Sequence, residues 1–320
     1  MKLLDKTVSQ ITIPTPFAVG DTHIYLIKGD VLSLVDAGVK TQEAWQALQL
    51  QLKELGYHPN DIEQVILTHH HPDHIGLVDQ FPWAHRIIAH KDVNPWLTRN
   101  EAFFKRYEQF FKDYFIVNGV PEQYHHILDG MRGTLRFVGK GELTDTIYDG
   151  AVLPGHEDWR VIETKGHAQS HLSFLRESDG TFIGGDHLLQ HISPNPLIEP
   201  PHKGEKKRPR PMLQYRANLK KCLSLEINTV LPGHGGIFSN LNEIIPKRLI
   251  KQEQRAEKVR SLLMENKQTA FQICEQLFVK QYEKQLDLTM SETIGQLDYL
   301  EDEGIIEHTV EDGIIFYYAK

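Results

Sequence analysis

The stretch that most constrains this chain covers residues 65–76 and reads Val-Ile-Leu-Thr-His-His-His-Pro-Asp-His-Ile-Gly. Its first four residues are apolar or β-branched and predict a buried strand, and Pro72 stands where a helix takes its first residue. The imidazoles therefore fall on a turn from strand to helix. Because successive residues of an extended chain point to opposite sides, His69 and His71 share one side and His70 points away.

The residue types in this turn are those of metal ligands. Asp73 and His74 follow on the first helical turn, so the stretch offers two pairs of donors, His69 with His71 and Asp73 with His74. Neutral imidazole and carboxylate are the donors that borderline divalent ions prefer. A solvated histidine-rich loop is the alternative, but random histidine clusters do not usually sit between a strand and a helix start. We therefore predict a metal site here, and we expect substitution of His70 to be milder than that of His69.

The plan of a strand, a glycine or proline turn and a presented histidine or aspartate recurs three times. His167 and His171 follow one strand, Asp186 follows a short apolar strand with two glycines, and His234 follows another. Asp36 also ends an apolar strand, although by itself it reads as a turn residue. In layered α/β proteins ligands gather at strand ends, so we expect these sites to converge.

Composition limits the class of protein. At 320 residues the chain is long enough for one large domain or two ordinary ones. A net charge of −8 argues against general affinity for nucleic acid or anionic membranes. Neither a signal peptide nor a membrane span is apparent, so we expect a cytoplasmic protein. Cys222 and Cys274 form no C-x-x-C pair, which argues against a disulfide scaffold or a thiolate zinc finger.

Periodicity predicts alternating strands and helices in the first part of the chain, interrupted by an aromatic helical segment at about 95–137. Most of its aromatic residues are expected in a core, and the alternative is a lid whose aromatics line a substrate pocket. Strands are expected at 8–14, 22–28, 31–38, 65–68, 86–91, 147–150, 159–167, 181–186 and 229–234, and a helix at 41–56.

These motifs resemble those of the metallo-β-lactamase superfamily, most closely its glyoxalase II-like hydrolases. The resemblance rests on Thr68–His74, Gly166–His171, Gly184–Asp186 and Pro232–Gly235, in this order and with Leu34–Gly38 upstream. It implies an α/β fold, a four-layer αββα sandwich with the site at one edge of two facing sheets.

Carried over residue by residue, the resemblance also implies a role for each polar residue. One departure is Lys165, where the family often has proline, which leaves the ligands intact. The first metal would be bound by His69, His71 and His167, the second by Asp73, His74 and His234, with Asp186 bridging both and Asp36 and His171 orienting the ligands.

The implied chemistry is hydrolysis. Two divalent ions held by these residues would lower the pKa of a water molecule, and Asp73 would orient this water as a catalytic residue. Zn²⁺ is favoured for this mixed donor set, and Fe or Mn also fit. We predict a small thioester, ester or lactone substrate; the alternative is a phosphodiesterase or endoribonuclease that uses the same site. A non-catalytic binding protein is a third interpretation. Such a protein would normally have lost one of the metal-binding residues, and none of the seven is missing here.

A basic run at residues 203–210 follows the strand that carries Asp186. It is either a solvated linker or a source of substrate anchors, with Lys206, Lys207 and Arg208 as the candidates. Such anchors would suit a coenzyme A or glutathione thioester, or an RNA strand.

We place a domain boundary near residue 246, so that residues 1–246 form the catalytic domain and residues 247–320 a connecting helix and a small domain. The small domain resembles a winged helix, with helices at 269–278 and 291–303 and a hairpin at 305–318. No Lys or Arg occurs from Gln285 to Ala319, which argues against a DNA reader. We therefore interpret it as a packing module, against the catalytic domain or against a second copy in a homo-oligomer.

Overall fold

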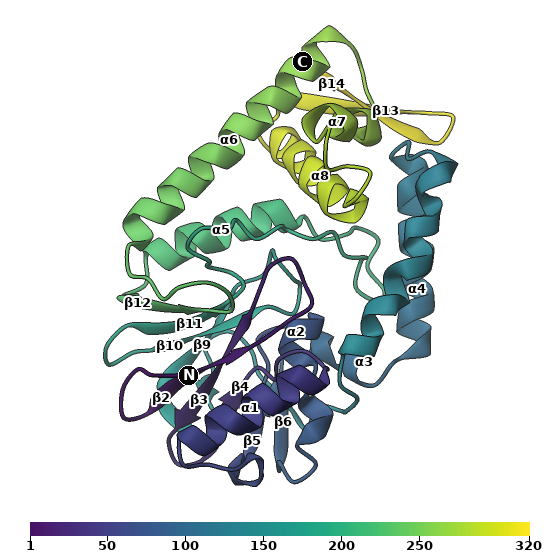
Figure 1. Cartoon of the computed structure of the whole chain (residues 1–320). Helices are drawn as coiled ribbons and strands as arrows, with labels where there is room; N and C mark the ends of the chain where they lie inside the picture. The colour runs from purple at the N-terminus through teal and green to yellow at the C-terminus, as the bar shows by residue number, and fades with distance from the viewer. The chain divides into compact units, whose positions relative to one another are not determined.

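The computed structural model describes residues 1–128, 130 and 132–320 (Figure 1). The chain forms two compact units that interleave along the sequence, instead of dividing near residue 246 as predicted. The first unit comprises residues 1–100, 134–194 and 222–241, and the second comprises residues 101–133, 195–221 and 242–320.

Two β-sheets make up the framework of the first unit. The first sheet holds β1 (Lys2–Leu3), β2 (Val8–Ile13), β3 (Thr22–Lys28), β4 (Leu32–Val35), β5 (Gln64–Ile66), β6 (Arg86–Ala89) and β7 (Asp145–Thr146) in that order. Its pairs are antiparallel from β1 to β4 and parallel from β4 to β7. The second sheet has the order β12 (Thr229–Pro232), β11 (Thr181–Gly185), β10 (Leu172–Arg176), β9 (His156–Glu163) and β8 (Val152–Leu153), and only its β11–β12 pair is parallel.

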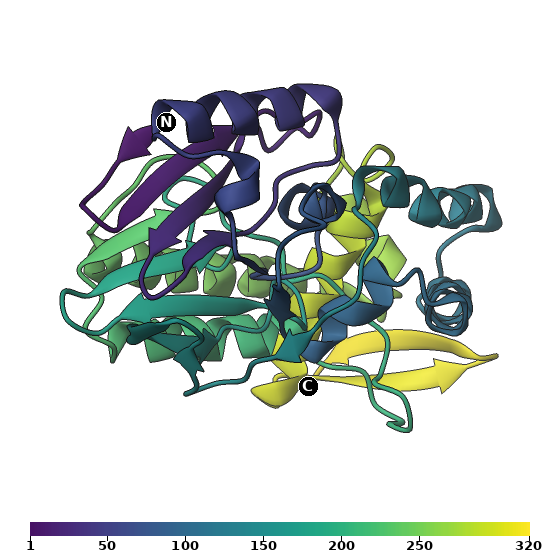
Figure 2. The ribbon, with the colours of Figure 1, turned by 90° about the horizontal axis from the view of Figure 1, so that it is seen from below.

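Alternate residues of the first sheet enter two different cores. Ile24 and Leu26 of β3 pack with the buried side of helix α1 (Gln42–Glu54), whereas Tyr25 and Ile27 pack with residues of the second sheet. Figure 2 shows α1 over one face of the first sheet and the second sheet on the other face. Both faces are apolar because both are covered, which is the layered α/β arrangement predicted from the sequence.

Short helical turns connect the strands of the first unit. The strands observed differ from those predicted at two places. The signal at residues 147–150 is a turn that follows β7, and β10 was not predicted. The short elements are η1 (Pro59–Asp61), α2 (Pro72–Ile75), η2 (Val78–Gln80), η3 (Lys91–Val93), α3 (Asn94–Leu97) and η4 (Glu122–Phe137), the last of which continues from the second unit.

The second unit is mainly helical. Its elements are α4 (Glu101–Val117), α5 (Pro211–Leu223, whose last two residues belong to the first unit), α6 (Leu241–Glu265), α7 (Ala270–Leu277), α8 (Leu286–Asp302), β13 (Ile306–Glu311) and β14 (Ile314–Ala319). Phe110, Phe111, Tyr114 and Phe115 of α4 share one apolar core with α7 and α8. Phe115 is therefore a core residue and the other three are partly buried against this core, so the packing joins the segment to the C-terminal residues.

The C-terminal hairpin is confirmed, with β13 and β14 paired in antiparallel register around Asp312 and Gly313. Both turn residues have positive φ, 50° and 81°, as a two-residue hairpin turn requires. Helix α8 begins at Leu286, five residues before the predicted start, because Leu286 and Met290 are buried in the core of this unit. The winged-helix assignment stays a prediction. Among the described residues, no helix is both long and apolar enough to cross a membrane.

Candidate metal centre

The turn after β5 presents its histidines as the strand alternation predicts. Helix α2 begins at Pro72, with His71 in extended conformation before it. His69 and His71 lie in one group of potential ligands, while the buried His70 ring stacks on Trp96, with ring centroids 4.5 Å apart.

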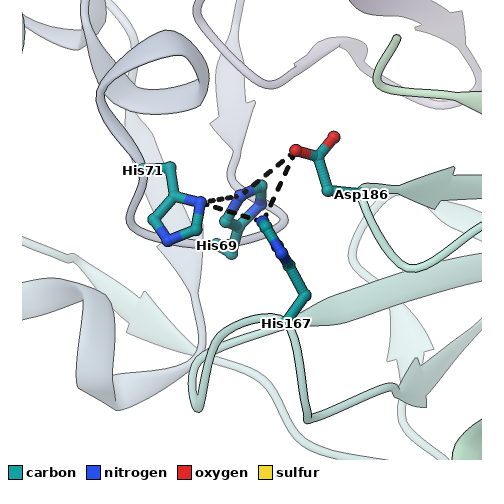
Figure 3. A group of neighbouring side chains, drawn as sticks. All are labelled: His69, His71, His167 and Asp186. Atoms are coloured by element: carbon teal, nitrogen blue, oxygen red, sulfur yellow. Dashed lines mark hydrogen bonds and ion pairs between the residues drawn. The ribbon is translucent and has the colours of Figure 1, made fainter. Parts of the chain in front are cut away.

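The first group of potential ligands contains three imidazoles and one carboxylate, which point toward one another in Figure 3. His71 Nδ1 lies 3.0 Å from the Nε2 atoms of both His69 and His167. Asp186 Oδ2 is 3.5 Å from His167 Nε2 and 4.0 Å from His69 Nε2. His69 and His71 come from the first sheet and His167 and Asp186 from the second, so this group joins the ends of both.

The second group consists of Asp73, His74 and His234, all buried. Asp73 Oδ2 lies 3.2 Å from His234 Nε2 and 3.9 Å from His74 Nε2. Asp186 also reaches this group, because its carboxylate oxygens are 3.4 Å from both His74 Nε2 and His234 Nε2. The carboxylate of Asp186 thus lies between the two groups, where a bridging ligand would be needed.

Hydrogen bonds behind the ligands determine which ring nitrogen carries the proton. His74 donates from Nδ1 to the Asp36 carboxylate at 2.8 Å, and His234 donates from Nδ1 to the carbonyl oxygen of Asp21 at 2.8 Å. Since a carboxylate or carbonyl oxygen only accepts, the proton of each neutral ring stays on Nδ1, and loss of the second proton leaves an Nε2 lone pair directed into the site.

The Thr68 hydroxyl fixes the His69 tautomer in the same way. Its single proton goes to Asp36, at 2.8 Å, so its oxygen accepts from His69 Nδ1 at 2.9 Å. His69 therefore also aims an Nε2 lone pair at the site. Asp36 adopts φ 65°, a strained value for a residue other than glycine, which is consistent with a functional constraint.

His171 supports the bridging carboxylate from behind. Its Nε2 accepts a hydrogen bond from the backbone N–H of Asp186 at 3.0 Å, and its Nδ1 donates to the Thr164 hydroxyl at 2.8 Å. The predicted orienting residues Asp36 and His171 thus both contact ligand residues. Sequence reasoning did not identify Thr68 or Thr164, although each adjoins a ligand motif.

The electrostatics of the two groups differ. Burial and neighbouring imidazoles hold the pKa of His69 and His71 well below the usual value, so these rings are neutral at pH 7. Burial alone would also lower the pKa of His74 and His234, but nearby carboxylates, above all Asp186, raise the pKa of His74 well above the usual value and that of His234 to about 10.

Two glycines make room for the Asp186 carboxylate and its support. A Cβ atom on Gly233 would lie 2.2 Å from Asp186 Oδ1. Gly185 has φ 48°, and a Cβ atom there would lie 2.8 Å from His171 Nε2. Both positions therefore require glycine, as the glycine turns in the sequence suggested.

The residues fit a pair of divalent metal ions. Within the described residues, His74 Nε2 and Asp186 Oδ1 are buried and have no hydrogen-bond partner. Buried polar atoms of this kind are rarely left unsatisfied, and here both atoms are potential donors to a cation. Together with His71 Nδ1, which lies 3.0 Å from the Nε2 atoms of His69 and His167, they indicate that the two groups could hold two metal ions.

The candidate substrate anchors differ from one another. Lys206 and Lys207 are exposed, whereas Arg208 donates from both guanidinium Nη atoms to Asp298 of α8, at 2.7 and 2.8 Å, and lies over the Tyr114 ring. The anchor role predicted for Arg208 therefore needs correction, because this side chain already pairs with a carboxylate of its own unit.

The comparisons with known proteins agree with this geometry. The model of a family described as the metallo-beta-lactamase superfamily matches residues 18–234. The chain belongs to this superfamily. Its α/β metallo-β-lactamase fold, predicted from the sequence motifs, is thereby confirmed.

Three similar proteins illustrate the relationship. The chain is 42% identical to the Bacillus subtilis (strain 168) protein named "Probable metallo-hydrolase YqjP", over 97% of each chain. It is 25% identical to an atrochrysone carboxyl ACP thioesterase of Aspergillus fumigatus, over 74% of this chain and 58% of the relative. The crystal structure of a metallo-β-lactamase family protein from Thermus thermophilus superposes with a TM-score of 0.81 at 25% identity, covering 99% of this chain and 100% of that one. These findings support a metallo-hydrolase of the superfamily.

Proposed function

We propose that this chain is a two-metal hydrolase of the glyoxalase II-like branch that cleaves a thioester, ester or lactone of a small substrate. The observation that carries the proposal is the convergence of seven donor residues on two adjacent groups that share Asp186. Hydrogen bonds behind three of the rings direct their Nε2 atoms inward, so this part of the donor set is preorganised for a cation that displaces protons from His74 and His234.

The chain's own residues would bind and orient the reacting groups. His69, His71 and His167 would hold one ion, Asp73, His74 and His234 the other, and Asp186 would contact both. When bound, two divalent ions, for which Zn²⁺ is our first candidate, lower the pKa of a shared water toward neutrality and polarise a substrate oxygen.

Asp73 would orient the attacking water and receive its proton. Although burial raises the pKa of this carboxyl, the imidazoles of His74 and His234 lower it below the usual value, so Asp73 is ionised at pH 7. Its Oδ2 also accepts a hydrogen bond from the Thr22 hydroxyl at 3.1 Å, which limits its rotation. A fixed, ionised carboxylate can accept a hydrogen bond from the water and so orient it, which is the geometric requirement of a general base.

Two features favour a carbonyl substrate over an RNA strand. The relative from Aspergillus fumigatus is named a thioesterase, which supports acyl transfer to water on this scaffold. The alternative, a phosphodiesterase or endoribonuclease, depends on the basic run at 203–210. In that run Arg208 pairs with Asp298, and Arg210 lies 3.6 Å from both Glu301 and Asp302. Acids of the same unit therefore pair with two of the five cationic side chains in this run.

A substrate panel tests the proposal. The purified, zinc-loaded protein is assayed with acyl-glutathione, acyl-coenzyme A, an N-acyl homoserine lactone and single-stranded RNA, each at low and high salt. We expect hydrolysis of at least one carbonyl substrate with weak salt dependence, because few phosphates are neutralised on binding. Cleavage of RNA alone, falling steeply with salt, would replace the proposal with its alternative.

The same assay tests the exposed lysines of the basic run. If Lys206 and Lys207 anchor an anionic substrate tail, the Lys206→Ala/Lys207→Ala variant should raise KM for acyl-coenzyme A and leave kcat unchanged. An unchanged KM would assign both lysines to a solvated linker.

A further inference from the structure

His70 is the histidine of the β5–α2 turn that faces away from both metal groups, yet it is buried and has defined partners. Its backbone N–H donates to Ser170 Oγ at 3.2 Å, and its Nδ1 lies 2.8 Å from the same oxygen. The His70 ring also stacks on Trp96 at an interplanar angle of 14°. One side chain thus contacts two other segments of the first unit.

Ser170 lies in the turn that supplies ligands from the second sheet. His167 precedes it in this turn, and His171, the next residue, supports the backbone of Asp186. A backbone hydrogen bond from Leu172 N–H to Thr68 C=O, 2.8 Å long, joins the same two turns. The bonds of His70 to Ser170 therefore lie directly between the turn of His69 and His71 and the turn of His167.

The second metal group is joined across the sheets in another way. The backbone N–H of His23 donates to Gly233 C=O at 2.6 Å, and Thr22 forms a β-bridge with His234. The Tyr25 hydroxyl adds a bond to Pro232 C=O at 2.7 Å. Backbone contacts thus hold the turn of His234 against β3, whereas the two turns of the first group are joined by one backbone bond and by the pair His70 and Ser170.

We propose that His70 is a positioning residue that, through Ser170, holds the turn of His69 and His71 against the turn of His167 and so keeps the first metal group assembled. This inference rests on the proposed two-metal site but concerns the first group alone. Removing the pair should cost metal affinity, since the three imidazoles come from turns that belong to different sheets and a small relative shift separates their nitrogens.

Competition between the protein and a chromophoric chelator for Zn²⁺ tests this inference. The metal-free protein is titrated with Zn²⁺, which should show two binding steps. His69→Ala should lack the step that belongs to the first metal group, called the first step, and His234→Ala the step that belongs to the second group. We expect Ser170→Ala and His70→Phe each to lower the Zn²⁺ affinity of the first metal group about tenfold and to leave that of the second group unchanged. A tenfold loss is the lower end of the effects seen for residues that hydrogen-bond behind metal ligands. His70→Phe keeps a ring against Trp96, so it isolates the bond to Ser170.

Two further variants separate positioning from general stability. His70→Asn places a polar atom near the position of Nδ1 and should recover most of the affinity. The double variant Ser170→Ala/His70→Phe should be no weaker than Ser170→Ala, because Ser170→Ala already removes the Nδ1 bond that His70→Phe removes, together with the bond from the His70 backbone N–H. Ser33→Ala is the matched control: it removes another buried Ser–His bond of the first unit, 2.6 Å to His156, and should lower the melting temperature without changing either step.

The results that overturn the inference are distinct from those that overturn the proposed function. An unchanged first step in Ser170→Ala and His70→Phe, or an equal loss in both steps, would show that the pair does not position the first group. A wild-type protein that takes up no Zn²⁺ would contradict the two-metal function itself, and the inference with it.

Discussion

The two metal groups lie at the same edge of one unit. They differ in solvent exposure, in the protonation of their imidazoles and in the hydrogen bonds that hold their ligand residues in place. The first is rich in imidazole, with His71 and His167 partly exposed, whereas every residue of the second is buried. Burial lowers the pKa of His69 and His71 in the first group, and carboxylates raise the pKa of both rings in the second. The comparison suggests that the first group is the accessible one and that the second is an enclosed site whose occupancy depends on displacing protons.

Asp186 contacts both metal groups, so its substitution should reduce metal binding at both. We expect Asp186→Ala to reduce metal content at both groups and to abolish nearly all turnover, because this carboxylate lies within 3.5 Å of ligand nitrogens in each. Elemental analysis and the hydrolysis assay measure both effects. Loss of one ion alone would show that Asp186 serves a single group.

Substitution within one group should separate the two. His69→Ala is expected to empty the first group and remove nearly all turnover, and His234→Ala to empty the second, each leaving about one ion per chain, since three donors no longer enclose the ion. Metal content after dialysis measures this difference. His70→Ala should be milder than His69→Ala; equal effects would contradict the proposed register of the turn.

Asp36 should affect the second group more strongly than the first. It accepts directly from His74 Nδ1, whereas it reaches His69 through the Thr68 hydroxyl. We expect Asp36→Ala to weaken metal binding at the second group about 10- to 100-fold, as is typical of residues that orient a ligand. Asp36→Asn is the control, because asparagine tolerates the positive φ and keeps one acceptor. An equal loss of metal affinity at both groups would contradict the expectation that Asp36 acts mainly on the second.

Protons should compete with metal at the second group and much less at the first. In the metal-free protein the pKa of His234 is raised to about 10, so its protonated form stabilises the fold below its ordinary pKa of 6.5, and this contribution is lost as pH rises through about 10. Metal affinity at the second group should therefore rise between about pH 7 and 9, with proton release on binding.

At the first group the pKa of His69 and His71 is lowered, so affinity should be flat over the same range and fall only in acid. Calorimetry in two buffers of different ionisation enthalpy counts the protons at each step. Equal proton release at both steps would remove this distinction between the groups.

The candidate donor residues could be predicted from local rules, whereas their division between two metal ions came from the family resemblance. Strand alternation separates His70 from His69 and His71, Pro72 marks the helix start, and glycine turns at strand ends mark Asp186 and His234. The structure brings these residues together as that reasoning expects.

The remaining features depend on contacts between distant residues, which periodicity does not encode. Arg208 was a candidate substrate anchor in a basic run, but its guanidinium pairs with Asp298, which lies 90 residues away in the sequence. Likewise the aromatic spacing of α4 shows that it has an apolar face but not which partner buries it, and that partner proved to be α7 and α8. The bonds of His70 to Ser170 span 100 residues and could not be read from either motif alone.

Metal content of the wild-type protein tests the central claim most directly. The protein is purified without added metal, loaded with Zn²⁺, dialysed against metal-free buffer and measured by elemental analysis against protein concentration from amino-acid analysis. The two groups predict two ions per chain, falling to about one in His69→Ala and in His234→Ala. A wild-type protein that retains no metal, or that keeps a single ion unaffected by both substitutions, would contradict the two-metal account.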